Sequence, residues 1–195
     1  MAAEDYDYKA LRAKIGMVPQ KAVLFKGTIR ENLLMGLPEE YKKKLEENPD
    51  SRDETIEKML RDALEISQSA EFVDNKPEGM ETMVSQGGKN LSGGQKQRLC
   101  IARAILKDAP IYVFDDSFSA LDFLTEANLR RSLNEKIQGK TQIVITQRIT
   151  SAMNADHIFV MDRGRLVDHG VHAELLSRCK IYQEIYASQT GGDAK

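Results

Sequence analysis

The sequence has 195 residues, of which 41% are hydrophobic and 30% charged, with a net charge of −2 at pH 7. This length and composition suit one globular domain with a sizeable core, and the near-neutral charge argues against a general nucleic-acid or membrane-surface binder. No apolar run approaches the roughly 18–20 residues of a membrane-spanning helix, and the N-terminal residues lack the apolar segment of a signal peptide.

The N-terminal half of the chain is mostly helical in its pattern. The charged segment at 39–53 is interpreted as a solvated helix and turn rather than a binding patch. The other expected elements, in chain order, are a helix at 8–14, a strand at 15–18, helices at about 54–66 and 68–75, a Gly- and Pro-containing loop at 76–90, and a helix at 93–107.

The C-terminal half alternates strands and helices. Continuous apolar runs at 111–114 and 141–146 predict strands buried on both faces of a parallel sheet. The remaining expected elements are helices at about 123–137 and 149–153, a strand at 158–161, a hairpin turn at 163–164 leading to 166–167, and helices at about 172–177 and 179–187. The alternation predicts a three-layer α/β fold, with the helical middle as an inserted subdomain.

The cysteines and histidines suggest no metal centre. Cys100 and Cys179 lie far apart and are interpreted as two reduced thiols rather than a disulfide or metal site. His157, His169 and His172 show no metal-ligand spacing.

The stretch "NLSGGQKQRL" at 90–99 predicts a loop that opens a helix, with Ser92 as the N-cap. Such a helix start favours an anion, because its first N–H groups point outward. The lysine-bearing phosphate loop, G-x-x-x-x-G-K-[ST], is absent from all 195 residues. The sequence therefore raises the question of whose phosphate this helix start holds.

Polar residues follow three of the expected strands. Asp115 and Asp116 follow one strand, Thr146 and Gln147 end another, and Gln20 follows the first. Ligands of open parallel sheets bind beyond the carboxyl ends of the strands, and a strand-end aspartate can position Mg²⁺ for nucleotide hydrolysis. Taken alone, a strand-end aspartate is more often a helix or turn cap.

Taken together, "MVPQ", "LSGGQKQRL", "IYVFDD", "SALD" and "ITQR" resemble, in order and spacing, the ATP-binding cassette (ABC) ATPase domain. The match covers nearly the whole chain, and "QKAVLFKGTIRENL" and "DHIFVMDRGRLVDHGVHAELL" resemble the exporter branch. The resemblance implies an α/β fold: a P-loop-NTPase-like core of mostly parallel sheet between helices, with an inserted helical subdomain. It places the core at 1–24 and 109–195 and the helical subdomain at 25–108.

The resemblance also implies roles for individual residues, with ATP and Mg²⁺ as the bound groups. Gln20 matches the glutamine that senses Mg²⁺ and the attacking water, and Asp115 matches the Walker B aspartate that holds Mg²⁺. The segment 119–122 matches the D-loop, so that Asp122 lies at the dimer interface. The signature residues contact the γ-phosphate of ATP held by the opposite subunit; they are Ser92, Gly93, Gly94 and Gln95.

The sequence departs from the family in three ways. The Walker A loop and the adenine-stacking aromatic residue should precede Gln20 and are not found, so the chain is interpreted as the C-terminal part of a nucleotide-binding domain that is inactive alone. Asp116 replaces the catalytic glutamate, and a misplacement of about 1 Å can cost on the order of 100-fold in rate. Gln147 replaces the switch histidine and cannot carry a charge near pH 7.

These losses beside an intact signature resemble the degenerate half of a heterodimeric ABC exporter. The expected partners are a second half-transporter and a transmembrane domain, which would place the chain at the cytoplasmic face of a membrane; no nucleic acid is expected. The alternatives are a non-transport ABC module with a regulatory or structural role, and a truncated product without function. Domain type identifies an ATP-driven motor and not its cargo.

Overall fold

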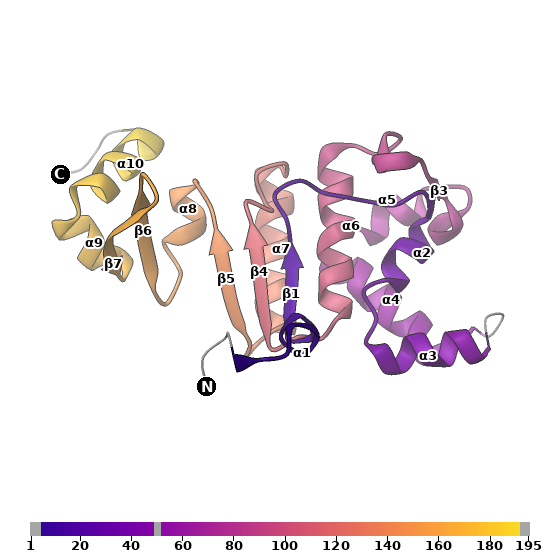
Figure 1. The fold of residues 1–195 in the computed structure, drawn as a ribbon. Helices are drawn as coiled ribbons and strands as arrows, with labels where there is room; N and C mark the ends of the chain where they lie inside the picture. The colour runs from indigo at the N-terminus through magenta and orange to yellow at the C-terminus, as the bar shows by residue number, and fades with distance from the viewer. Residues whose placement is uncertain (1–4, 49–51, 192–195) are drawn as a thin grey trace. The chain divides into compact units, whose positions relative to one another are not determined.

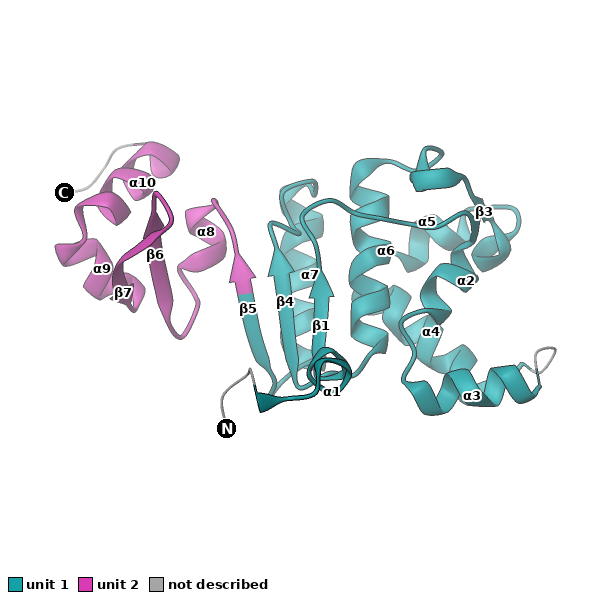
Figure 2. Cartoon of the chain, viewed as in Figure 1, with its two compact units in different colours: residues 1–143 teal, residues 144–195 magenta. Residues whose placement is uncertain are grey.

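The computed structural model describes residues 5–48 and 52–191. The chain divides into two compact units, residues 1–143 and 144–195 (Figure 2). The elements of the first unit are α1 (Tyr8–Ala13), β1 (Ile15–Val18), β2 (Gly27–Thr28), α2 (Ile29–Leu34), α3 (Glu39–Glu47), α4 (Glu54–Ile66), α5 (Ala70–Asp74), η2 (Gly79–Glu81), β3 (Met83–Val84), η3 (Gln86–Gly88), α6 (Gly93–Leu106), β4 (Ile111–Asp115) and α7 (Phe123–Lys136).

The strand β5 (Thr141–Ile145) crosses the boundary between the units. The second unit continues with α8 (Ile149–Ala152), β6 (Ile158–Asp162), β7 (Arg165–Gly170), α9 (His172–Arg178) and α10 (Lys180–Thr190). Within the described parts of both units, no helix has the length and apolar character needed to cross a membrane.

The main sheet has the strand order β1-β4-β5, and β1 pairs with β4 in parallel (Figure 1). Val18 lies opposite Phe114 in this register. The carboxyl ends of β1 and β4 therefore lie at the same edge of the sheet. This is the edge at which the sequence predicts a ligand.

One face of the β1–β4 pair is covered by helices. Tyr112 and Phe114 are fully buried, and a Cβ atom added at Gly16 would lie only 3.2 Å from the main-chain oxygen of Ala104. Helix α6 thus approaches β1 closely, and a glycine at 16 leaves the space. Figure 1 shows α7 behind the same pair of strands.

The expectation that the strands at 111–114 and 141–146 are buried on both faces is wrong for the described chain. Ile143 is 48% exposed, and Ile111 and Val113 are half-buried. Met17 in β1, for which no such burial was expected, is 56% exposed. Successive side chains of a strand point to opposite faces. In β4 the side chains on one face are buried and those on the other are half-buried, whereas β5 has no buried side chain on either face. The apolar runs correctly indicate the strands but overstate their burial.

The helical part of the first unit packs around α6. The helices predicted at 54–66 and 93–107 are confirmed as α4 and α6. Asp53 caps α4 by accepting from the main-chain N–H of Thr55 at 2.8 Å and of Ile56 at 3.2 Å. The charged segment forms α3, as predicted; the turn predicted after it includes residues 49–51, which lie outside the described residues.

Two features of this region were not predicted. Helix α2 begins with a capping box, in which the main-chain N–H of Glu31 donates to Thr28 Oγ1 and that of Thr28 donates to the Glu31 carboxylate. The strands β2 and β3 pair antiparallel, with Gly27 opposite Val84. The segment expected as a loop at 76–90 therefore returns to the residues just before α2.

The second unit is a hairpin packed with helices. β6 and β7 pair antiparallel with each other, which confirms the hairpin predicted from the strand at 158–161 through the turn at 163–164. The two strands form a sheet separate from β1-β4-β5. Leu175 and Tyr182 are almost fully buried and share a core with Ile149, Ile158, Val160 and Cys179. Cys179 and, in the first unit, Cys100 are buried free thiols.

The finer division predicted from the sequence, with a helical subdomain at 25–108, does not coincide with the boundary between the two units. It stays a prediction.

Candidate functional site

The signature segment begins helix α6 with a reciprocal cap. The Ser92 hydroxyl accepts from the main-chain N–H of Gln95 at 3.2 Å, and the Gln95 side chain accepts from the N–H of Ser92 at 3.1 Å. The N-cap role predicted for Ser92 is therefore confirmed. The first helical hydrogen bond runs from the main-chain N–H of Lys96 to the main-chain oxygen of Ser92. The main-chain N–H groups of Gly93 and Gly94 come before this bond and are not used in the hydrogen bonds of the helix.

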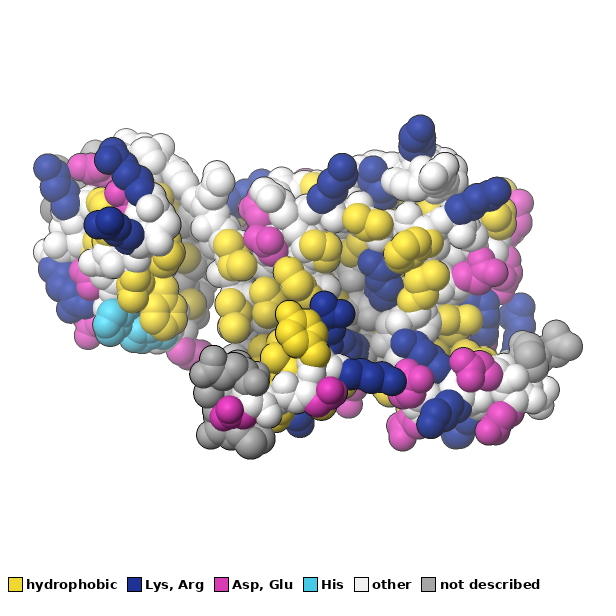
Figure 3. Space-filling view, viewed as in Figure 1, with side chains coloured by type: hydrophobic (Ala, Val, Ile, Leu, Met, Phe, Trp, Pro, Cys, Tyr) yellow, Lys and Arg dark blue, Asp and Glu magenta, His cyan; other side chains and the backbone are white. Residues whose placement is uncertain are grey.

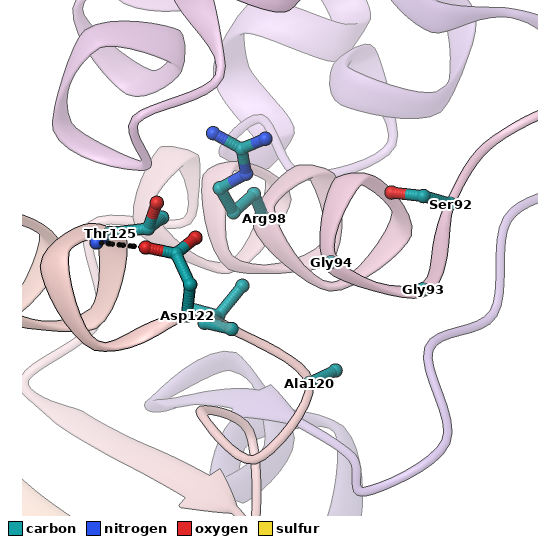
Figure 4. Close-up of a pocket in the computed structure, with 8 residues that line it drawn as sticks. Ser92, Gly93, Gly94, Arg98, Ala120, Asp122 and Thr125 are labelled. Atoms are coloured by element: carbon teal, nitrogen blue, oxygen red, sulfur yellow. Dashed lines mark hydrogen bonds between the residues drawn. The ribbon is translucent and has the colours of Figure 1, made fainter.

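A cavity of about 430 Å³ opens beside this helix start (Figure 4). It is lined by residues from the beginning of α6 and from the turn that leads into α7, which are Ser92, Gly93, Gly94, Arg98, Ala120, Leu121, Asp122 and Thr125. Two motifs that the sequence offers separately, "LSGGQ" and "SALD", thus form one pocket.

Gly94 sets how closely these two motifs approach. A Cβ atom added there would lie 3.1 Å from the main-chain oxygen of Ala120 and 3.5 Å from Leu121 Cδ2. A Cβ atom added at Gly93 would have no neighbour within 4 Å. Packing is therefore tight at the second glycine of the pair and open at the first.

Arg98 is a pocket residue that the sequence reasoning did not single out. Its guanidinium donates through Nη1 to the main-chain oxygen of Gln68 and lies over the Phe72 ring, 4.8 Å from the ring centroid. Burial lowers the pKa of Arg98, while the negative charges of Asp122 and Glu71 oppose the shift. Arg98 nevertheless stays cationic, as arginines do in proteins.

The sequence did contain one signal that Arg98 belongs to the pocket. Arg98 lies four residues after Gly94, and residues i and i+4 share a helix face.

Asp122 is the N-cap of α7. Its carboxylate accepts from the main-chain N–H of Thr125 at 2.9 Å, and the hydrogen bonds from Thr125 lower its pKa. The structure thus gives Asp122 a local structural role at the rim of the pocket (Figure 4).

A second group of predicted residues gathers at the carboxyl ends of β1 and β4. Asp115 is the last residue of β4, and Gln20 lies two residues after β1. The buried Ser117 hydroxyl ties the two strand ends together, because it donates to the main-chain oxygens of Val18 at 3.0 Å and of Asp115 at 3.2 Å. Asp115 and Asp116 are half-buried, whereas Gln20 is exposed. None of the three lines the pocket at the signature.

Asp116 has an unusual backbone conformation, with a φ of 43°. This left-handed region is uncommon for residues other than glycine, and asparagine and aspartate are enriched in it. An aspartate at this position is therefore compatible with the local backbone.

Gln147 lies in the second unit and is described within it alone. It follows β5, and its main-chain oxygen accepts from Gln189 Nε2 at 2.7 Å. The Gln189 side chain also accepts from the main-chain N–H of Ile149 at 2.8 Å, so α10 holds the turn that follows Gln147.

The strand-end group has the donors that Mg²⁺ prefers. Asp115 offers a carboxylate and Gln20 a carboxamide oxygen, and Mg²⁺ is usually bound through one or two carboxylates with substrate phosphates and water. Among the described residues, no cluster of three or more His, Cys, Asp or Glu could hold a metal ion. These residues therefore fit Mg²⁺ as part of a nucleotide complex rather than in a protein cage.

Comparison with known proteins gives consistent matches. The family profile described as "ABC transporter" matches residues 2–119. An uncharacterized ABC transporter ATP-binding protein of Mycobacterium tuberculosis is 42% identical over 186 residues, which are 95% of this chain and 30% of that protein. An ATP-dependent lipid A-core flippase of Shewanella frigidimarina is 37% identical over 185 residues, which are 95% of this chain and 28% of that protein.

The fold matches a solved structure equally well. A bacterial Atm1-family ABC exporter with ATP bound superposes with a TM-score of 0.82 and 36% sequence identity, over 93% of this chain and 30% of that one. The chain thus spans about a third or less of the length of the relatives that it matches.

Proposed function

The chain belongs to the ABC transporter family, and we propose that it is the ATP-binding part of an ABC exporter. The similarity to a lipid A-core flippase and to an ATP-bound Atm1-family exporter supports the exporter branch. In such an assembly the domain lies at the cytoplasmic face of the membrane beside a transmembrane domain. ATP binding and hydrolysis then drive the movement of a substrate through that domain.

In this proposal the signature serves ATP held by a partner subunit. The pocket between Ser92 and Asp122 carries the proposal, because it joins a helix N-terminus, a hydroxyl and the Arg98 cation in one cavity. Outward N–H groups and a cation suit a phosphate. Ser92, Gly93, Gly94 and Gln95 would hold the phosphate end of that nucleotide, with the D-loop beside it.

The chain's own catalytic position is proposed to be degenerate. The Asp116 carboxylate is one methylene shorter than that of glutamate, which retracts it by roughly 1–1.5 Å; a misplacement of about 1 Å can cost on the order of 100-fold in rate. Gln147 can donate a hydrogen bond but cannot carry the charge of a protonated histidine. Neither Asp116 nor Gln147 lines the signature pocket. In this proposal the signature therefore still donates hydrogen bonds to the ATP of the partner subunit.

Mg²⁺ is proposed to bind with ATP at the strand ends. When bound, the ion neutralises charge on the nucleotide's phosphates. Asp115 would hold it through its carboxylate, and Gln20 would contact it at the edge of the sheet. The proposed subdomain at 25–108 would carry the signature, while 1–24 and 109–195 would carry these strand-end residues.

The proposal is tested by counting trapped nucleotides. The exporter that contains this domain is assembled with its partner half and trapped with vanadate and labelled ATP. We expect one rapidly trapped nucleotide per pair of domains, because one composite site keeps its catalytic base. Two nucleotides trapped at equal rates would contradict the asymmetric assignment.

A further inference from the structure

Two histidine rings meet on the hairpin of the second unit. His157 precedes β6 and His169 lies on β7, and His157 Nε2 is 3.0 Å from His169 Nδ1. Both side chains are exposed, and histidine rings (cyan) are visible at the surface in Figure 3. A solvent ion can therefore reach both nitrogens.

The hairpin holds these two rings in place. Phe159 lies opposite His169 in the strand register, and its ring centroid is 4.9 Å from that of His157 and 6.1 Å from that of His169. The phenyl ring therefore packs against both imidazoles and limits their rotation.

The backbone of His169 is fixed from both sides. Its N–H donates to Asp168 Oδ1 at 2.8 Å, and its carbonyl accepts from Arg178 Nη2 at 2.8 Å. Arg178 also pairs with the Asp168 carboxylate at 3.2 Å. An ion pair between β7 and α9 thus anchors one of the two imidazoles.

The spacing of the two nitrogens suits a shared metal ion. With metal–nitrogen bonds of about 2.0–2.1 Å, two ligands at a right angle lie about 2.9 Å apart, and two at the tetrahedral angle lie about 3.3 Å apart. The observed 3.0 Å is close to the right-angle value. Right-angle nitrogen ligands are typical of tetragonal Cu²⁺ and Ni²⁺, and imidazole is a preferred ligand of both.

We propose that His157 and His169 form an exchangeable binding site for a divalent transition metal ion of tetragonal preference, Cu²⁺ or Ni²⁺. His157 Nε2 and His169 Nδ1 coordinate the ion, while the remaining nitrogen of each neutral ring carries the proton. In the hydrogen-bonded pair one of the facing nitrogens carries that proton, so one ring changes tautomer when the ion enters. Water fills the other coordination positions, and the ion joins the two strands of the hairpin.

The site is independent of the proposed transport function. Its residues lie in the second unit, whereas the signature pocket lies wholly in the first. The test therefore measures metal binding alone.

The experiment uses the full 195-residue chain and two metal probes. Equilibrium dialysis against Ni²⁺ at about pH 8, where free imidazole is neutral, measures affinity and stoichiometry. Electron paramagnetic resonance of the Cu²⁺ form counts the imidazole nitrogens bound to the metal. We expect one Ni²⁺ per chain and the hyperfine pattern of two imidazoles.

Single variants then assign the ligands. His157→Gln and His169→Gln should each weaken Ni²⁺ binding at least about tenfold and leave the Cu²⁺ spectrum with one imidazole from this pair. The matched control is His172→Gln, because His172 lies in the same unit with its Nδ1 2.8 Å from the Tyr182 hydroxyl. It should bind Ni²⁺ as the unchanged chain does.

Metal binding that survives in both single variants would overturn the proposal, and so would an equal loss in His172→Gln. Circular dichroism of each variant accompanies the dialysis. Both proposed ligands are exposed, so we expect the far-ultraviolet spectra to match that of the unchanged chain.

Discussion

The side chain of Gln97 in helix α6 donates to the main-chain oxygen of Pro19, the residue immediately before Gln20, with an Nε2···O distance of 3.4 Å. Gln97 is only 3% exposed. On the other side, the buried Ser117 hydroxyl donates to the main-chain oxygen of Val18. The strand end that leads to Gln20 is therefore held both by the signature helix and by the turn after Asp115.

The first prediction concerns this contact of a buried side chain. Gln97→Ala removes the donor to the half-buried Pro19, so we expect the free energy of unfolding to fall by about 0.5–1.5 kcal/mol. Urea denaturation followed by circular dichroism measures the change. The matched control is Gln86→Ala, an exposed glutamine in the same unit, for which we expect a change within about 0.5 kcal/mol. Equal effects of the two substitutions would show that the contact contributes nothing.

The second prediction concerns the N-cap of α7 and pH. Because hydrogen bonds from Thr125 lower the pKa of Asp122, the charged form is favoured in the folded chain. Its stabilisation is fully present above the unfolded pKa and is lost as the pH falls through the folded pKa. Asp122→Asn keeps a capping side chain that does not titrate, so stability should depend less on pH below about pH 4.

Unfolding midpoints measured at neutral pH and in this acidic range test this pH effect. Glu135→Gln, an exposed carboxylate removed from the same helix, is the control and should leave the pH dependence nearly unchanged. A pH dependence of Asp122→Asn identical to that of the unchanged chain would exclude the proposed contribution.

Much of the fold follows from local sequence signals, and the exceptions have identifiable causes. Helices α4 and α6 are marked by Asp53 and Ser92, which accept from main-chain N–H groups as the N-cap pattern predicts. Helix α2 has the same type of signal, since Thr28 and Glu31 form a capping box. It could have been predicted from the spacing of those two residues.

The burial of the strands could not be predicted in the same way. Burial depends on which elements pack against each face of the strand. An apolar run predicts the strand but does not indicate which elements will pack against it. The exposed Met17 and Ile143 belong to strands correctly placed by their sequence.

The candidate site shows the same limit. Ser92 and Asp122 are recognisable as motif residues, but only the packing of Gly94 against Ala120 joins the two motifs into one pocket. His157 and His169 are twelve residues apart, and only the register of the hairpin brings their rings together. Their sequence spacing alone gave no indication of a metal site.

The third prediction compares the proposed role of the signature at the partner's ATP with the proposed loss of the catalytic base at Asp116. In the assembled exporter, Ser92→Arg fills the signature pocket and removes a donor to the partner's phosphate, so the ATPase rate should fall by about 100-fold or more. Asp116→Asn should cost far less, because in the proposed mechanism the aspartate is too short to act as the base. Steady-state ATPase rates of the two variants make the comparison. Comparable losses from both would contradict the assignment.

The fourth prediction concerns the two substitutions that would restore the site proposed to be degenerate. Asp116→Glu together with Gln147→His should add a second rapidly trapped nucleotide per pair of domains, with a gain of up to about 100-fold in hydrolysis at that site. Because the backbone of Asp116 is left-handed, the longer glutamate should also lower stability slightly. Vanadate trapping before and after the double substitution is the measurement. The single substitution Gln147→His is the control, since it leaves the short carboxylate in place and should not add the second nucleotide.

The last prediction uses the two glycines of the signature as a matched pair. Gly94→Ala would place a Cβ atom 3.1 Å from the main-chain oxygen of Ala120, whereas Gly93→Ala meets nothing within 4 Å. Overpacking of this kind typically costs about 1–3 kcal/mol, so Gly94→Ala should be less stable than Gly93→Ala by about that amount. Both variants gain the same side chain at adjacent positions of one helix, so the difference in urea midpoint reports the contact of Gly94 with the turn at Ala120. Equal midpoints would mean that the turn at Ala120 moves freely away from α6, and the pocket would then not be a fixed feature of this chain.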